Sequence, residues 1–190
     1  MTADLHSREH TGSEDAETLP PEAFKNVFRR HPAGVAVITL AVGERLVGFT
    51  ATSVISVSAE PPLIAFSVAG TSSSWTALAL ADTVVVNFLT AQQVEVSTRF
   101  ATSGIDRFAH GGWSLLPTGE PVLDATPRWV RGRIVQRTPV GSSHLVCLHA
   151  LNGSTSGQPG ATGPAGDGDD VPPLVYHNRV YHRIGDNSAL

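Results

Sequence analysis

Cysteine is almost missing from this chain of 190 residues, because Cys147 is its only cysteine. A single thiol excludes an intrachain disulfide and any metal centre made of several cysteines, and it is typical of the reducing cytoplasm, where we expect the protein to act. Long apolar runs are missing too: nowhere do about 18 apolar residues follow one another, and residues 1–18 are polar. We therefore expect neither a membrane span nor an export signal.

An excess of positive charge is also missing. The chain has 13 basic and 17 acidic residues, a net charge of −4, and no cluster of Lys and Arg. Binding to nucleic acid usually requires such a cluster, so no nucleic-acid partner is expected. The sequence also lacks the glycine-rich loops of P-loop and dinucleotide-binding proteins and the Gly-x-Ser-x-Gly turn of many serine hydrolases. These absences exclude the commonest nucleotide-binding and hydrolase motifs.

Histidine does not form a metal-binding pattern either. His144 and His149 are five residues apart on one expected strand, and His177 and His182 are five apart across the last expected hairpin. Side chains at an odd spacing on an extended chain point to opposite faces. We therefore expect no metal site.

Short apolar runs separated by turn residues make up most of the chain. A content of 41% hydrophobic and 16% charged residues fits one globular domain. We expect strands at residues 34–40, 46–57, 63–68, 84–89, 113–116, 121–123, 128–137, 144–151, 173–177 and 179–184. Short helices should begin near Pro21, Trp75 and Thr90. Because strands and helices do not alternate regularly, the expected class is mainly β, an antiparallel barrel or sandwich with a few short helices.

Composition marks the ends of this domain and one insertion in it. Residues 1–18 have few apolar groups and predict a disordered lead-in, followed by the domain at residues 19–185 and a loose end at residues 186–190. Between residues 152 and 170 the chain consists mostly of Gly, Ser, Thr, Pro and Asp. This composition predicts a mobile loop inserted in the domain.

The stretch from Gly48 to Ile64 points most clearly to function. Hydroxyl side chains occupy positions 50, 52, 53, 56 and 58, where an ordinary core strand would carry Val or Leu. Pro61 and Pro62 cannot donate to a sheet ladder, so a strand should end there. An exposed Thr/Ser-rich strand is the plain interpretation. Small hydroxyls and accessible backbone N–H groups also suit a polar, planar ligand with a sugar-like chain, which would bring its own chemistry.

Several segments match one protein family in order and spacing: 34–39, 48–62, 86–89, 99–101 with 106–108 after it, and 173–176. From about Phe24 to Ile184 the chain resembles the short-chain flavin reductases, in particular the small reductase component of two-component flavin-dependent monooxygenases. The resemblance implies an FMN-binding split β-barrel, an antiparallel fold of Greek-key type. It also implies a homodimer, because an open barrel leaves sheet edges to cover.

The flavin site that this resemblance implies is a set of small polar residues with one cation and one ring. It comprises Thr50, Ala51, Thr52, Ser53, Ser67, Ser72, Ser73, Ser74, Arg99 and Phe100. The first four would line the flavin ring and ribityl chain, and the other serines would lie near the phosphate. Arg99 would bind the phosphate, and Phe100 would be a wall of the site. Each has a plainer explanation, since Ser72 can cap a helix, Arg99 can pair with Glu95 and Phe100 can belong to the core.

By the same resemblance, His144 would be the catalytic residue and would lie close to the nicotinamide. The family usually has Gly-Asp-His at this place, whereas this chain has Ser142, Ser143 and His144, so the acidic partner of the histidine is missing. Tyr176 and Arg179 would contact the rest of the nucleotide, although a tyrosine in a hairpin often packs on the sheet instead.

The activity implied is that of an NAD(P)H:flavin oxidoreductase. NADH or NADPH would pass a hydride to FMN or FAD, and the reduced flavin would leave for a separate monooxygenase. Two alternatives stay open. One is a split-barrel oxidoreductase that retains a flavin or deazaflavin and reduces another substrate, and the other is a non-catalytic flavin- or haem-binding module.

Overall fold

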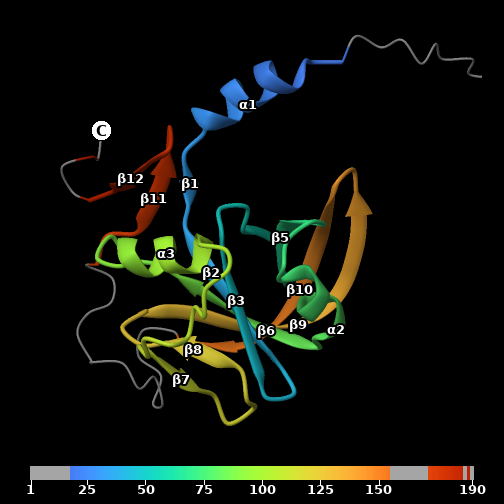
Figure 1. Ribbon diagram of the computed structural model, residues 1–190, viewed down its shortest axis with the longest axis vertical. Helices are drawn as coiled ribbons and strands as arrows, with labels where there is room; N and C mark the ends of the chain where they lie inside the picture. The colour runs from blue at the N-terminus through green and yellow to red at the C-terminus, as the bar shows by residue number, and fades with distance from the viewer. Residues whose placement is uncertain (1–17, 155–170, 186–187, 189–190) are drawn as a thin grey trace, which may run out of the picture.

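The computed structural model describes residues 18–154, 171–185 and 188 (Figure 1). Almost all of the expected disordered lead-in, most of the expected mobile loop and most of the expected loose C-terminus lie outside these residues. The domain boundaries therefore stay predictions.

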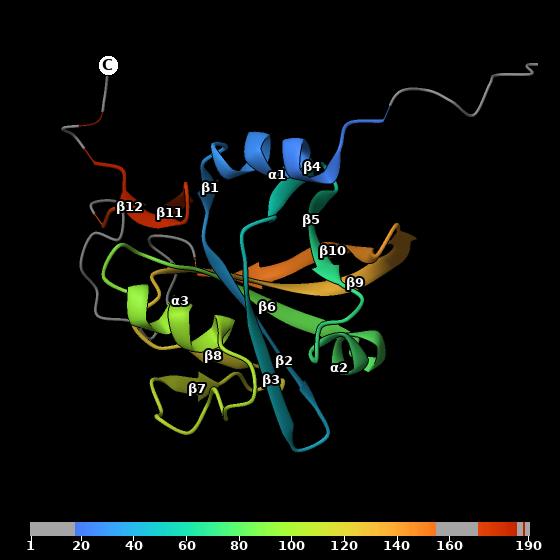
Figure 2. The ribbon, with the colours of Figure 1, turned by 45° about the horizontal axis from the view of Figure 1, so that its top comes forward.

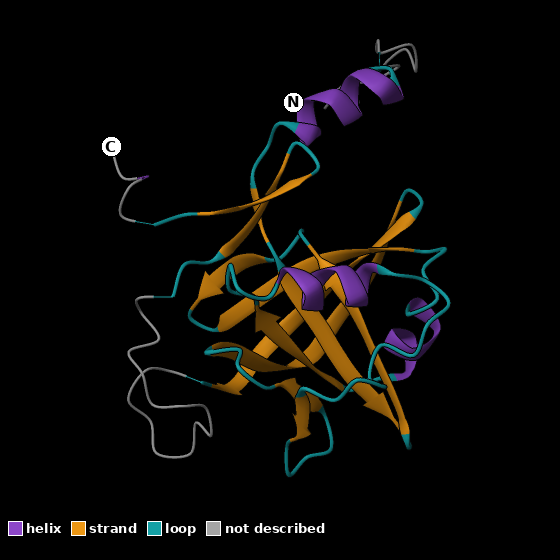
Figure 3. Ribbon diagram, turned by 60° about the vertical axis from the view of Figure 1, so that its left-hand side comes forward, coloured by secondary structure: helices purple, strands orange, loops and turns teal. Residues whose placement is uncertain are grey.

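One sheet of seven strands forms the body of the protein and curls into a barrel (Figures 1 and 3). Its order is β3 (Arg45–Ala51), β2 (Ala36–Val42), β6 (Thr83–Phe88), β9 (Arg128–Val140), β10 (Ser143–Gly153), β5 (Pro62–Ala69) and β4 (Ile55–Ala59). Every neighbouring pair is antiparallel, and the two edge strands, β3 and β4, are not paired with each other within this sheet. The barrel is therefore split along one line, which confirms the expected antiparallel split barrel.

Smaller elements surround the barrel. β1 (Ala33–Gly34), β11 (Leu174–His177) and β12 (Val180–Arg183) form one small sheet, and β7 (Trp113–Leu115) pairs with β8 (Pro121–Leu123). α2 (Trp75–Leu80) and α3 (Val94–Ala101) lie against the barrel, whereas α1 (Pro21–Arg29) stands away from it and buries none of its residues (Figures 1 and 3). Within the part of the chain that the structure describes, no helix is long and apolar enough to cross a membrane.

Strand β2 is buried on both of its faces. Successive side chains of a strand point to opposite sides of the sheet. Ile38 and Leu40 therefore join one core together with Phe66 of β5, and Val37 joins a second core that contains Phe100 of α3. The near-continuous apolar run of this strand follows from that double burial.

The hydroxyl-rich stretch does not form the single strand expected at residues 46–57. β3 ends at Ala51, residues 52–54 cross the split, and β4 begins at Ile55 and pairs with β5 instead of β2. The Oγ of Ser53 fixes this crossing, because it donates to the carbonyl oxygen of Ser67 at 3.1 Å and accepts from its amide at 3.0 Å. The stretch thus supplies both edges of the open barrel. β4 ends at Ala59, before the two prolines, as expected.

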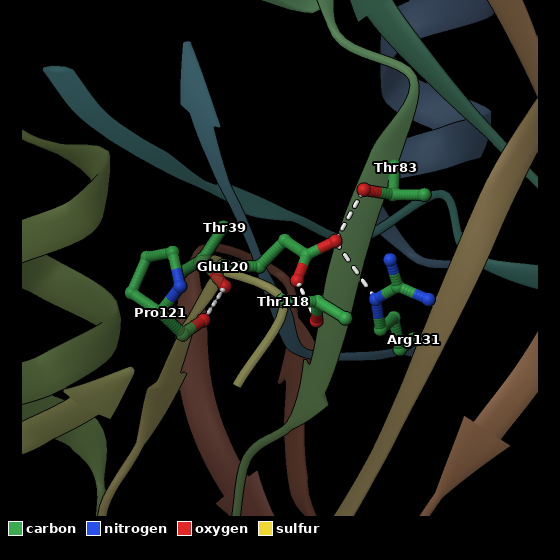
Figure 4. A network of polar contacts seen from close by, with 6 residues as sticks. All are labelled: Thr39, Thr83, Thr118, Glu120, Pro121 and Arg131. Atoms are coloured by element: carbon green, nitrogen blue, oxygen red, sulfur yellow. Dashed lines mark hydrogen bonds and ion pairs between the residues drawn. The ribbon is translucent and has the colours of Figure 1, made fainter. Parts of the chain in front are cut away.

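A buried polar network attaches the β7–β8 hairpin to the barrel (Figure 4). The carboxylate of Glu120 accepts hydrogen bonds from Thr83, Thr118 and the Nε of Arg131, the last at 2.7 Å. Burial raises the pKa of Glu120, but the hydrogen bonds from Thr118, Thr83, the backbone and Arg131 together hold it below its ordinary value of 4.5. Glu120 is 3% exposed, so its charge is balanced inside the protein rather than by water.

Candidate active site

A polar cavity of about 220 Å³ lies where three distant segments meet beside the first half of β3. β3 contributes residues 45–48, the turn before α2 contributes Ser73 and Ser74, and the loop after α3 contributes Arg107 and Phe108. Two of the predicted serines are therefore brought together. Two arginines, Arg45 and Arg107, line the cavity, and neither was among the predicted site residues.

Arg107 is held in place by hydrogen bonds to backbone and side chain. Its Nη1 donates to the carbonyl oxygen of Gly48 at 2.6 Å and to the Oγ of Ser74 at 3.4 Å, and its Nε donates to the carbonyl oxygen of Thr102 at 2.9 Å. Burial lowers the pKa of Arg107 from its ordinary value. A guanidinium still keeps its charge at neutral pH. Arg45 and the carboxylate of Asp106 line the cavity as well, so two arginines and one aspartate leave it a formal excess of one positive charge.

The floor of this cavity depends on a glycine. A Cβ atom on Gly48 would lie 2.5 Å from the Cε1 of Phe100, closer than real contacts allow. Phe100 is fully buried, and its ring meets that of Phe108 edge to face, with centroids 5.2 Å apart. Phe100 therefore supports the cavity from below, and Phe108 lines it.

Arg99, which the sequence placed on the phosphate, does not line the cavity. Its guanidinium carbon lies 5.5 Å from the centroid of the Phe100 ring. Its Nε is buried and has no hydrogen-bond partner among the residues that the structure describes. Arg107 lies in segment 106–108, which matches the family in sequence. An arginine in a loop has no hydrophobic periodicity around it, so the pattern did not identify it as a site residue.

The predicted site residues 50–53, at the end of β3 and in the crossing that follows, differ in burial and in hydrogen bonding. Thr50 donates from its Oγ1 to the carbonyl oxygen of Ser97 at 2.7 Å, Ala51 is buried, and Thr52 is exposed. Ser53 is bound to the backbone of Ser67, as described above. Among Thr50, Thr52 and Ser53, Thr52 is the exposed residue, whereas the other two are half-buried and hydrogen-bonded to backbone.

Of the three serines before α2, Ser72 serves the turn itself. Its Oγ accepts a hydrogen bond of 3.3 Å from the amide of Ser74. Ser73 is exposed and Ser74 is buried, and both line the cavity. Since α2 has only six residues, its dipole adds little to the charge of Arg107.

His144 is the second residue of β10 and does not line the cavity. Its imidazole stacks on the indole of Trp75. Val146 and Leu148, on the same face of β10, are fully buried, which fits the predicted alternation. His149 lies on the other face and pairs with Leu63 of β5.

Tyr176 and Arg179 are not brought to this site within one chain. Tyr176 packs on the ring of Tyr181, with centroids 5.2 Å apart, and Arg179 is exposed in the turn between β11 and β12. Figures 1 and 2 show this hairpin on the opposite side of the barrel from α2.

One expectation about the histidines is wrong. His177 and His182 do not point to opposite faces, because their rings lie 5.6 Å apart. His177 pairs with Val180 and His182 with Val175, so the two histidines are diagonal neighbours across the hairpin. The described residues nevertheless contain no group of three or more side chains that could hold a metal ion.

An open antiparallel barrel with a small cavity that carries excess positive charge has the polarity that suits an anionic small molecule. Comparison with known proteins is more specific: residues 28–185 match the flavin reductase like domain. The chain belongs to this family.

Two relatives and one solved structure illustrate the similarity. The NADH:FMN oxidoreductase of Rhodococcus qingshengii is 43% identical over 166 residues, which cover 84% of this chain and 80% of that protein. The reductase subunit HsaB of a flavin-dependent monooxygenase from Mycobacterium tuberculosis is 32% identical, covering 70% of this chain and 71% of that one. A flavin reductase domain protein from Arthrobacter sp. FB24 shares the fold with a TM-score of 0.74 and 36% identity, over 86% of this chain and 94% of that one.

Proposed function

We propose that this chain is an NADH:FMN oxidoreductase that delivers reduced flavin to a separate monooxygenase. The observation that carries the proposal is the cavity at the split, where Arg107 places a fixed positive charge beside two serine hydroxyls. Guanidinium and hydroxyl groups are the usual partners of a phosphate dianion. The similar oxidoreductase from Rhodococcus supports FMN and NADH as the pair of substrates.

The size of the cavity indicates which part of the flavin it takes. A volume of about 220 Å³ is below the range of about 300–1,000 Å³ that encloses a whole ligand. It suits the phosphate and part of the ribityl chain. The rest of the flavin would lie outside, against the exposed Thr52 and the crossing at residues 52–54.

The residues of the chain would bind and orient rather than exchange protons. When bound, the flavin supplies the hydride acceptor. Arg107, Ser73 and Ser74 would hold the phosphate, Thr50 to Ser53 would position the ring, and His144 would hold the nicotinamide. Tyr176 and Arg179 of a second copy are proposed to contact the adenylate part, because the β11–β12 hairpin lies on the opposite side of the barrel from α2, whose Trp75 stacks on His144.

The proposal of a separate monooxygenase partner rests on the expectation that the flavin is bound loosely. A flavin that is only partly enclosed can leave after reduction, which a reductase that feeds another enzyme requires. The similarity to HsaB, itself a reductase subunit of a flavin-dependent monooxygenase, supports this assignment. The cytoplasm is the proposed location, as the single cysteine suggests.

A homodimer is the proposed assembly. Phe24, Val27 and Phe28 of α1 are 51%, 64% and 57% exposed, and Ile55 and Val57 of the edge strand β4 are 58% and 53% exposed. Apolar side chains grouped in this way usually mark an interface. A second copy that covers α1 and β4 would bury them.

Light scattering at micromolar concentration tests the dimer. We expect the mass of two chains for the wild type and a shift toward one chain for Phe28→Ser with Val57→Ser. Leu115→Ser, an exposed apolar residue on β7, is the matched control and should leave the mass unchanged. A monomeric wild type would refute the assembly.

The activity is tested by NADH oxidation followed at 340 nm with FMN, FAD or riboflavin added in turn, and then with NADPH. We expect turnover that depends on added flavin and is fastest with NADH and FMN. A protein that holds flavin tightly and oxidises NADH only when another organic substrate is present would be an oxidoreductase of a different kind. A flavin-binding protein without any NADH turnover would not be an enzyme of this class.

A further inference from the structure

The indole of Trp75 lies flat against the imidazole of His144. The ring centroids are 3.5 Å apart, and the planes differ by 13°. Trp75 is the first residue of α2, whereas His144 belongs to β10, where it pairs with Val68 of β5. Both side chains are partly buried. One face of the imidazole is therefore covered by the protein and closed to a ligand.

The surroundings of His144 leave one ring nitrogen for a ligand. Its Nδ1 is buried and has no hydrogen-bond partner within the described ranges of the chain. This edge of the ring faces Gly70, where an added Cβ atom would lie 3.5 Å from Cε1 and 3.7 Å from Nδ1. Hydrogen bonding to a nucleotide is then left to Nε2. Since Nδ1 has no partner to fix the ring, the stack on Trp75 is what fixes its orientation.

Hydrogen bonds in the turn before α2 fix the backbone that carries the indole of Trp75. The amide of Trp75 donates to the carbonyl oxygen of Ser72 at 3.0 Å, and the preceding residue, Ser74, is 1% exposed and bonded to Arg107. The backbone that carries the indole therefore has little freedom. Aromatic pairs in contact contribute about 0.5–1.5 kcal/mol beyond the area they bury.

We propose that Trp75 is a positioning residue for His144. Because the Nδ1 of His144 has no hydrogen-bond partner among the described residues, the stacked indole is the contact that orients the ring toward the nicotinamide. The inference rests on the proposed reductase activity, because it assigns a role in holding NADH. Trp75 acts through His144 and touches neither substrate in the reacting position.

The test is a double-mutant cycle on NADH oxidation with saturating FMN. Trp75→Ala should raise the KM for NADH about three- to tenfold, as the loss of one aromatic contact predicts, with a smaller change in kcat. Trp75→Phe, which keeps a flat ring, should recover most of this loss. In a background of His144→Ala, Trp75→Ala should cause no further increase.

Leu80→Ala is the matched control, because Leu80 lies on the same helix and is 70% exposed. It should leave the KM for NADH unchanged. Equal losses from Leu80→Ala and Trp75→Ala would show that any damage to α2 has the same effect. An undiminished effect of Trp75→Ala in the His144→Ala background would show that Trp75 does not act through His144. Either result would overturn the proposal.

An NMR measurement separates this inference from the proposed function. The ring current of a stacked indole should move the imidazole proton resonances of His144 upfield, and Trp75→Ala should move them back. Unchanged resonances would overturn the stack itself. If the stack is present but the wild type oxidises no NADH with any flavin, the proposed reductase activity fails, and with it the positioning role, while the geometry stands.

Discussion

Arg107 donates a hydrogen bond of 2.6 Å to the carbonyl oxygen of Gly48, a residue that precedes it by 59 positions. This bond joins the loop after α3 to the middle of β3 and leaves the guanidinium beside the serines of the cavity. It also explains why the charge that we assign to the flavin phosphate is Arg107 and not Arg99.

Arg107→Ala should weaken FMN binding by about 1.5–3 kcal/mol, the contribution of a hydrogen bond to a charged group. Riboflavin, which has no phosphate, should lose much less. Isothermal titration with both ligands measures the difference. Arg99→Ala should leave the preference for FMN intact. Equal losses of the two ligands in Arg107→Ala would make this residue part of the scaffold only.

Gly48→Ala should destabilise the protein by about 1–3 kcal/mol, the usual cost of overpacking a core. The added Cβ would lie 2.5 Å from the buried ring of Phe100, which has no room to move. Urea unfolding measures the free energy. Gly34→Ala is the control, because no atom lies within 4 Å of a Cβ placed there. Similar stabilities for the two variants would refute the close contact.

Glu120→Gln should lower the free energy of unfolding at pH 7 by about 1–3 kcal/mol, since it removes a buried charge that accepts several hydrogen bonds. The folded pKa of Glu120 lies below 4.5. Its ionised form therefore stabilises the fold above that pH, and the stabilisation disappears as the pH falls through the folded pKa.

Urea unfolding at several pH values checks this prediction. The difference between the wild type and Glu120→Gln should shrink in acid. The exposed Glu44, at the turn between β2 and β3, gives the control Glu44→Gln, for which no such difference is expected. A difference that is the same at pH 3 and pH 7 would contradict the role of the ionised carboxylate.

His144→Ala should raise the KM for NADH or lower kcat several-fold, about 1–2 kcal/mol of transition-state stabilisation, while flavin affinity changes much less. His149→Ala should leave turnover nearly intact, because His149 lies on the other face of β10. Steady-state measurement of kcat and of the KM for NADH in the two variants tests this prediction. A larger loss from His149→Ala would show that the nucleotide does not bind on the His144 side.

The sequence predicted the strands well where the pattern is local. The apolar run predicted as a strand at residues 34–40 overlaps most of β2, Ala36–Val42, and the predicted alternation from His144 to Leu148 agrees with the burial of Val146 and Leu148. The crossing at residues 52–54 was missed, because β-branched and hydroxyl residues continue through it without a break in pattern.

The site was predicted only in part for a similar reason. The serines before α2 stand out by composition, and two of them line the cavity. The contact of Trp75 with His144 joins residues 69 positions apart in the chain. It depends on the pairing of β5 with β10, and no local pattern encodes that pairing.

The cavity spans the split of the barrel, and this placement connects ligand binding to folding. Gly48 belongs to β3, at one edge of the main sheet, whereas Ser73 and Ser74 follow β5, next to the other edge. A dianion held between them would act as a removable cross-link between two edges that share no ladder. By mass action, a ligand present at 100 times its Kd stabilises the folded chain by about 2.7 kcal/mol. The lifetime of the folded chain would then rise and fall with the supply of free flavin.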